Sequence, residues 1–186
     1  VGHVLSQLLG VVVADPDASI RQAVLRALDG RFHEHLCEVR RLRTVAFALH
    51  DEALAVRLVA VPLLGRLSAL NPAATLPQLR KLLLSLQCEL TAAGPIQHSL
   101  ARRRKEEAAQ MLTLLVRHAP RLARTYCRPL IDALLPLLRN TPHARTAAAL
   151  LYTLAELLSV ATSRLDQHAE PLLLLLVDAL RHSGSH

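Results

Sequence analysis

The feature that most constrains this chain is a helical pattern of apolar residues that occurs four times. Basic residues at Arg21, Arg57, Lys105 and Arg145 bring the four copies into register, with spacings of 36, 48 and 40 residues. In every copy three apolar residues follow the basic one. Counted from the first of the three, they stand at i, i+3 and i+4, which lie on one face of an α-helix. A helical unit that recurs in this way indicates a stack of similar units. The aligned columns are Val24, Ala60, Ala108 and Ala148; Ala27, Leu63, Met111 and Leu151; and Leu28, Leu64, Leu112 and Tyr152.

The composition agrees with an all-helical chain and excludes several other classes. The 186 residues include 43 Leu and 28 Ala, and only 2% are aromatic. Leu and Ala favour helices, whereas strands favour β-branched and aromatic residues, so a mostly-β fold is excluded. The hydrophobic fraction of 52% excludes a disordered chain. The longest aliphatic run, 172–177, is far shorter than the roughly 18 residues of a membrane span, and no signal peptide is recognisable.

Residues that stop or cap helices divide the chain into about nine helices. We group these helices into units of an A helix followed by a B helix. Pro77, Pro129 and Pro171 are expected in the first turn of A helices, where a missing N–H costs no hydrogen bond. The expected breaks are 15–17, 29–30, 50–51, 71–72, 93–95, 119–120 and 140–142.

The sequence therefore predicts an all-α fold, an α-solenoid of antiparallel helical hairpins that resembles HEAT and armadillo repeats. The last A helix lacks a B partner, so we expect a single array that is a fragment of a longer solenoid. The repeats are placed at about 1–29, 34–70, 74–118 and 124–160, with a truncated repeat at 167–182.

Four charged residues at the starts of the first two B helices are candidates for a ladder between repeats. Asp15 and Asp51 each stand six residues before a basic residue, Arg21 and Arg57. The Asp of one repeat can pair with the Arg of its neighbour. We expect these pairs to be exposed, and therefore to define the register of the stack more than to stabilise it.

The charge is basic overall, at +7, with 20 of the 22 cations being Arg. The densest group is Arg102, Arg103, Arg104 and Lys105. We interpret it as a solvated, frayed helix start, because cations there oppose the helix dipole. The alternative is a nuclear-localisation signal or a contact patch for an acidic partner. Scarcity of aromatic residues argues against single-strand nucleic-acid binding, whereas duplex binding through phosphates stays open.

No catalytic, cofactor or metal site is predicted. The Gly-rich loop, the His-Arg-Asp loop and the Asp-Phe-Gly motif of protein kinases are absent from the sequence. His33, His35 and Cys37 are close together, but further ligands with zinc-site spacing are lacking, so we interpret them as surface histidines and a part-buried thiol. All three cysteines are expected to be reduced, part-buried thiols of an intracellular protein: Cys37, Cys88 and Cys127.

Several segments resemble the HEAT-repeat region of the target of rapamycin (TOR) family of Ser/Thr protein kinases. The matching stretches are 14–36, 65–84, 118–139 and 153–161. The most specific is the Leu-Asn-Pro-Ala motif that begins at Leu70 and continues to Arg80-Lys81. Pro62, inside a B helix, and the long segment 91–105 depart from the family pattern. These departures affect loop contacts rather than the fold.

The resemblance implies a non-catalytic scaffold segment of a kinase complex in nutrient and growth signalling. Its expected partners are a Raptor-type subunit and a second TOR protomer. ATP and Mg²⁺ would bind only in the kinase domain of the parent chain. The parent protein is expected in the cytoplasm, and peripheral endomembrane association or a nuclear fraction stays open. The alternative is a stand-alone basic α-solenoid that acts as a transport or nucleic-acid-associated adaptor.

Overall fold

The computed structural model describes residues 2–92 and 99–160, and within them every regular element is helical. The predicted all-α class is confirmed. No helix in these two ranges is long and apolar enough to cross a membrane. The elements are α1 (Gly2–Ala14), α2 (Ala18–Ala27), η1 (Gly30–Phe32), α3 (His33–Leu36), α4 (Val39–Phe47), η2 (Ala48–His50), α5 (Leu54–Leu67), α6 (Pro72–Thr91), α7 (Ser99–His118), α8 (Pro120–Arg139) and α9 (Ala144–Val160).

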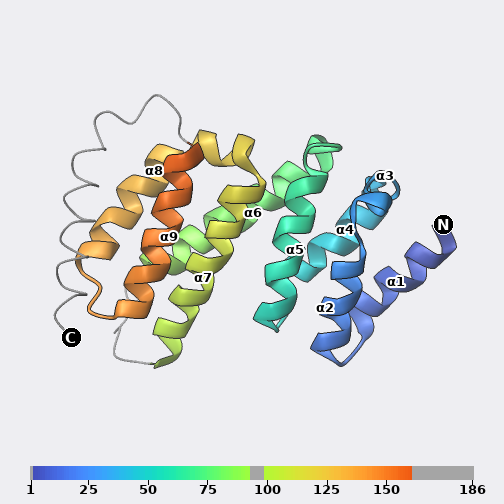
Figure 1. The fold of residues 1–186 in the computed structure, drawn as a ribbon, viewed down its shortest axis with the longest axis horizontal. Coiled ribbons are helices and arrows are strands. Elements are labelled where there is room, and N and C mark those ends of the chain that lie inside the picture. Colours follow the sequence, from blue (N-terminus) through green and yellow to red (C-terminus); the bar gives the residue numbers. More distant parts are fainter. Residues whose placement is uncertain (1, 93–98, 161–186) are drawn as a thin grey trace. The chain divides into compact units, whose positions relative to one another are not determined.

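The chain divides into two compact units, residues 1–85 and 86–186. In the first unit α1 and α2 form an antiparallel hairpin, and α4 and α5 form a second one (Figure 1). α2 packs against α5, and α1 packs against α4. The two hairpins therefore stack with like helices side by side, as in an α-solenoid.

The second unit is built around α9. Its most extensive contact is with α7, and α8 packs on both α7 and α9 (Figure 1). α8 and α9 are joined by a short turn and form a hairpin, and α9 stacks on α7. This is the same arrangement that α2 and α5 have in the first unit.

Local capping explains several helix starts. Asp17 precedes α2, and its carboxylate accepts a hydrogen bond of 2.8 Å from the Ser19 amide, a typical N-cap contact. Pro72 and Pro120 are the first residues of α6 and α8, where the missing N–H costs nothing. The prediction for Pro77 and Pro129 is wrong, because both lie inside these helices.

The predicted A helix of the second repeat, from residue 34 to the break at 50–51, is interrupted. α3 ends at Leu36, and α4 begins only at Val39, after Glu38 in an extended conformation. α5, in contrast, continues through Pro62 to Leu67. The repeat boundaries remain a prediction, and the helix expected at 167–182, with Pro171, lies outside the described residues.

The four repeat copies differ in which of their equivalent apolar residues are buried. Of the third apolar column, Leu28, Leu64 and Leu112 are at most 1% exposed, whereas Tyr152 is 70% exposed. For the fourth copy the predicted face is therefore wrong. α9 packs on α7 and α8 and buries the adjacent stripe instead, which consists of Thr146, Leu150, Thr153, Leu154 and Leu157.

Candidate functional site

Arg21 and Asp51 form an ion pair that joins the two hairpins of the first unit. Arg21 Nε and Nη2 donate to the two carboxylate oxygens of Asp51 at 2.8 and 2.7 Å. Arg21 Nη1 also donates to the carbonyls of Asp15 and Pro16, at 2.8 and 3.2 Å. One guanidinium thus connects the turn before α2 with the turn before α5. The bidentate geometry is specific to Arg, whose planar fork matches a carboxylate.

The pair is buried, and the expectation of an exposed pair is wrong. The side chains of Arg21 and Asp51 are 6% and 9% exposed. The hydrogen bonds from Arg21 hold the pKa of Asp51 below its ordinary value; burial opposes this shift, and the Ala53 amide and the charge of Arg57 add to it. In turn, the hydrogen bonds to Asp51 raise the pKa of Arg21. Both groups therefore carry their charges where helices α2 and α5 begin.

Of the four ladder residues, the structure brings Arg21 and Asp51 into direct contact across repeats. Asp15 acts mainly within its own turn, where its carboxylate accepts the Asp17 amide at 2.8 Å. Arg57 influences Asp51 through its charge. Gln22 adds a second link between the hairpins, because its Nε2 donates to the Ala55 carbonyl at 3.0 Å. This junction fixes α2 beside α5 in a parallel register.

In the second unit the matching junction is made by hydroxyl groups that sequence analysis missed. Thr153 is fully buried, and its hydroxyl lies 3.1 Å from the Ala109 carbonyl of α7 and 2.9 Å from the Ala149 carbonyl of its own helix. It also lies 2.9 Å from the hydroxyl of Thr113. Beyond this core, Arg117 Nε donates to Glu156 at 3.0 Å. The signal available in the sequence was the constant offset of about 40 residues between partners, which equals the repeat spacing.

Asn71, in the most specific sequence motif, also has a structural role that was not predicted. Its Nδ2 donates to the Cys37 carbonyl at 2.9 Å, and its Oδ1 accepts the Ala74 amide at 3.2 Å. The buried Thr75 donates its hydroxyl to the Asn71 carbonyl at 2.7 Å. Asn71 therefore caps α6 and holds the end of α3. Asn directly before Pro at a helix start is a local signature of such a cap.

The basic run of residues 102–105 lies in the first turns of α7. Arg102 and Arg103 pair with the acidic residues one turn later, at 3.9 Å from Glu106 and 2.9 Å from Glu107. Lys105 Nζ donates to the Ala92 carbonyl at 3.1 Å, and Arg104 is exposed. The run is thus part of a formed helix, and pairs at i and i+4 partly compensate its charge.

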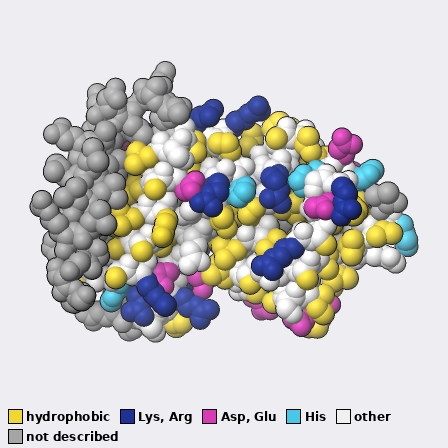
Figure 2. Space-filling view, viewed as in Figure 1, with side chains coloured by type: hydrophobic (Ala, Val, Ile, Leu, Met, Phe, Trp, Pro, Cys, Tyr) yellow, Lys and Arg dark blue, Asp and Glu magenta, His cyan; other side chains and the backbone are white. Residues whose placement is uncertain are grey.

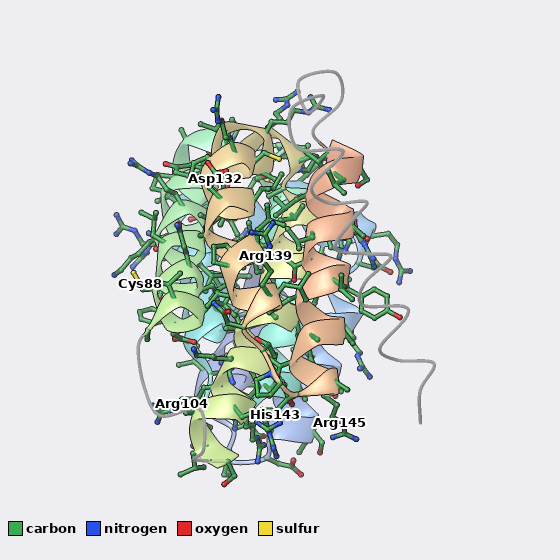
Figure 3. All side chains as sticks on the ribbon, turned by 90° about the vertical axis from the view of Figure 1, so that its left-hand side faces the viewer. Cys88, Arg104, Asp132, Arg139, His143 and Arg145 are labelled. Carbon is green, nitrogen blue, oxygen red and sulfur yellow. The ribbon has the colours of Figure 1, made fainter. Side chains whose placement is uncertain are left out.

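The histidine and cysteine residues singled out in the sequence lie in separate environments. Burial lowers the pKa of His33, and the charge of Arg66 lowers it further. Burial raises the pKa of Cys37 and of Cys127. Cys88 is exposed on the outer side of α6, so the expectation that it is part-buried is wrong (Figure 3). Within residues 2–92 and 99–160, no three potential ligand residues are grouped as a metal site requires.

Comparison with known proteins identifies relatives that are much longer than this chain. No protein-family model matches the sequence. All of the chain is 34% identical to part of the Ser/Thr-protein kinase mTor of Drosophila melanogaster. It is 38% identical over 86% of its length to the Ser/Thr-protein kinase tor1 of Schizosaccharomyces pombe, and 33% identical over its whole length to TOR2 of Saccharomyces cerevisiae. The chain spans about 7% of the length of each of these relatives.

Proposed function

We propose that this chain is a non-catalytic scaffold segment of a TOR Ser/Thr kinase. The premise is that the chain is homologous, over its whole length, to one segment of these kinases. The observation that carries the proposal is this continuous match to about 7% of each relative. The second support is the fold, because stacked helical hairpins present extended surfaces to protein partners.

The non-catalytic assignment rests on the chemistry of the sequence. Phosphoryl transfer in protein kinases requires a Gly-rich loop, a Lys that contacts phosphate and acidic residues that hold Mg²⁺. The 186 residues contain none of the motifs that supply these groups. ATP and Mg²⁺ would accordingly bind in another part of the parent chain.

The proposed mechanism is geometric. The buried pair of Arg21 with Asp51 fixes α2 against α5, and the Thr153 hydroxyl fixes α9 against α7. Each junction prevents neighbouring hairpins from sliding, so exposed side chains keep defined positions. Two of these side chains are large and hydrophobic: Phe47 and Tyr152, which are 68% and 70% exposed. We propose that such surfaces contact a Raptor-type subunit and a second protomer in a signalling complex.

The test is co-purification from cells that express the full-length parent protein, with or without this segment. We expect deletion to reduce recovery of the Raptor-type subunit or of the dimer. A second arm uses Phe47→Asp and Tyr152→Asp, which place a charge on exposed apolar positions, with Gln110→Asp at an exposed polar position of α7 as the control. Undiminished recovery of both partners in every variant and in the deletion would contradict the scaffold function.

The alternative, a stand-alone basic adaptor, is supported by the net charge of +7 alone. It would be favoured if the reading frame ended without a lipid-kinase-like catalytic domain. For the parent kinase we propose a cytoplasmic location, with peripheral endomembrane association or a nuclear fraction, and fluorescence imaging of the tagged full-length protein tests it.

A further inference from the structure

The segment between α2 and α4 contains a histidine ring with a buried nitrogen that lacks a partner. His33 is the first residue of α3, and its Nε2 is buried with no hydrogen-bond partner among the described residues. The neutral ring can keep its proton on Nδ1, which leaves Nε2 as an unused acceptor. The protonated ring carries an N–H at both nitrogens, and the buried one would lack an acceptor. Because a buried donor without an acceptor is costly, this site favours the neutral ring.

The groups around the ring decide the same question by burial and charge. Burial lowers the pKa of His33 below its ordinary value of 6.5, and the charge of Arg66 in α5 lowers it further. The charge of Asp29, just before η1, acts in the opposite direction and is the smaller influence. Figure 2 shows histidine, basic and acidic side chains close together on the surface around α3, whose place is given in Figure 1. The net effect is that the protein around His33 resists its protonation.

The residues that follow His33 hold two other parts of the first unit. The Cys37 carbonyl accepts a hydrogen bond of 2.9 Å from Asn71, which caps α6. The His35 carbonyl accepts one of 2.7 Å from Arg41 in α4. We call residues 33–37 the α3 joint. If the α3 joint opened, both hydrogen bonds would be lost together, and α4 and the start of α6 would be loosened.

We propose that the α3 joint is an acid-sensitive device, in which protonation of His33 opens the joint and releases α4 and the start of α6. Imidazole is suited to this role because it changes charge near neutral pH. In the open joint the ring is solvated and binds a proton readily, whereas in the closed joint the buried N–H has no acceptor. The closed joint is therefore fully stable above the ordinary pKa of 6.5 and loses stability as the pH falls from 6.5 towards the lower pKa of the closed form.

The pH range of this effect separates it from other titrations in the first unit. The pKa of Asp51, in the α2–α5 junction, lies below 3.8. Hydrogen bonds from Arg31 likewise hold the pKa of Asp29 below its ordinary value, so Asp29 stays charged. Burial raises the pKa of Cys37, so its thiol stays neutral. Between about pH 7.5 and about pH 5.5, His33 is thus the buried group of the α3 joint that changes charge.

The test is hydrogen exchange measured by mass spectrometry on the full-length protein at about pH 7.5 and about pH 5.5, with rates corrected for their intrinsic pH dependence. The peptides to follow cover residues 29–38 and the start of α6, and peptides of α7 and α9 serve as the internal reference. His33→Gln removes the titrating ring. His35→Gln is the matched control, since it makes the same change at an exposed position two residues later. Arg66→Gln keeps the ring and removes the neighbouring charge at an exposed position of α5.

One pH unit below 6.5 a solvated imidazole is about ten-elevenths protonated, so acid can favour opening by at most roughly tenfold. We expect protection of the α3 joint in the wild type to fall by about three- to tenfold. The His35→Gln control should show the same fall, and His33→Gln should abolish it. Arg66→Gln should reduce the fall, because the ring of the closed joint then binds a proton more readily.

The proposal would be overturned if the wild type showed no greater fall in the α3 joint than in the reference peptides. An equal fall in the wild type and in His33→Gln, or a fall that His35→Gln abolishes, would also overturn it. If His33→Gln exchanged rapidly at both pH values, the Arg66→Gln variant would decide: a reduced fall supports the proposal, and an unchanged or larger fall overturns it. The proposal goes beyond the scaffold function and is independent of it, because the measurement is protection of this joint and not recovery of a partner.

Discussion

Leu112 and Tyr152 occupy the same column of the sequence repeat, yet the structure predicts opposite consequences when each is replaced by Ala. Leu112 is fully buried in α7, whereas Tyr152 is 70% exposed on α9. Leu112→Ala removes buried methyl groups and leaves a cavity, which costs about 2 to 5 kcal/mol. Tyr152→Ala removes a mostly solvated ring and should change stability by about 0.5 kcal/mol at most.

Hydrogen exchange measured by mass spectrometry on the full-length protein reports this difference locally. The peptides to follow cover α7 and α9, which pack on each other. If the two helices open together, a loss of about 3 kcal/mol at Leu112 lowers their protection from exchange by roughly 100-fold. Tyr152→Ala should lower it by less than about threefold.

The comparison separates the repeat pattern from the tertiary packing. Similar losses of exchange protection for the two variants would mean that both side chains are buried, as their shared column in the sequence repeat predicts, and would contradict the exposure of Tyr152. A larger loss for Tyr152→Ala would refute the placement of α9. Ala148→Ser, at an exposed position of the same helix, serves as the control for changes in helix propensity.

Three further outcomes are expected. The folded pKa of Asp51 lies below its ordinary value of 3.8, so the ion pair should stabilise the α2–α5 junction fully above pH 3.8 and less as the pH falls through the folded pKa. Amide exchange rates corrected for their intrinsic pH dependence should show this loss of stability, and Asp51→Asn should abolish the pH dependence. Asn71→Ala should weaken the start of α6 by about 1 kcal/mol, seen as faster exchange there and near the Cys37 carbonyl, whereas unchanged exchange would contradict the cap. Maleimide should modify exposed Cys88 far faster than buried Cys127, whose raised pKa also lowers its thiolate fraction, and comparable rates in native protein would refute this burial.

Helix starts with a local cap were predictable from the sequence. Asp17 accepts the amide of Ser19, and Pro72 lacks the N–H that a first helical residue would leave unpaired, so short motifs contain the necessary information. Pro77 and Pro129 show the limit of the same reasoning. Proline is favoured in a first turn, but a long helix that packs on its neighbours can also retain one in its interior.

The end of α3 could not have been predicted in this way. No Gly or Pro occurs from residue 37 to residue 50, so the sequence predicted a helix from residue 34 to the break at 50–51. The chain nevertheless leaves the helix at Cys37, whose carbonyl accepts a hydrogen bond from Asn71. A partner 34 residues away satisfies this carbonyl, so the break depends on a contact that local sequence does not contain.

The candidate sites also combine features that the sequence determines with features that only tertiary contacts determine. Periodicity and composition were sufficient for the all-α class, the stacked hairpins and the residues Arg21 and Asp51, because helix periodicity and the repeat offset are properties of the chain itself. The burial of that pair and the outward position of Tyr152 depend on how α5 packs on α2 and α9 on α7. Packing sums many weak contacts between distant residues, and small rotations of a helix change which side of an apolar stripe is covered.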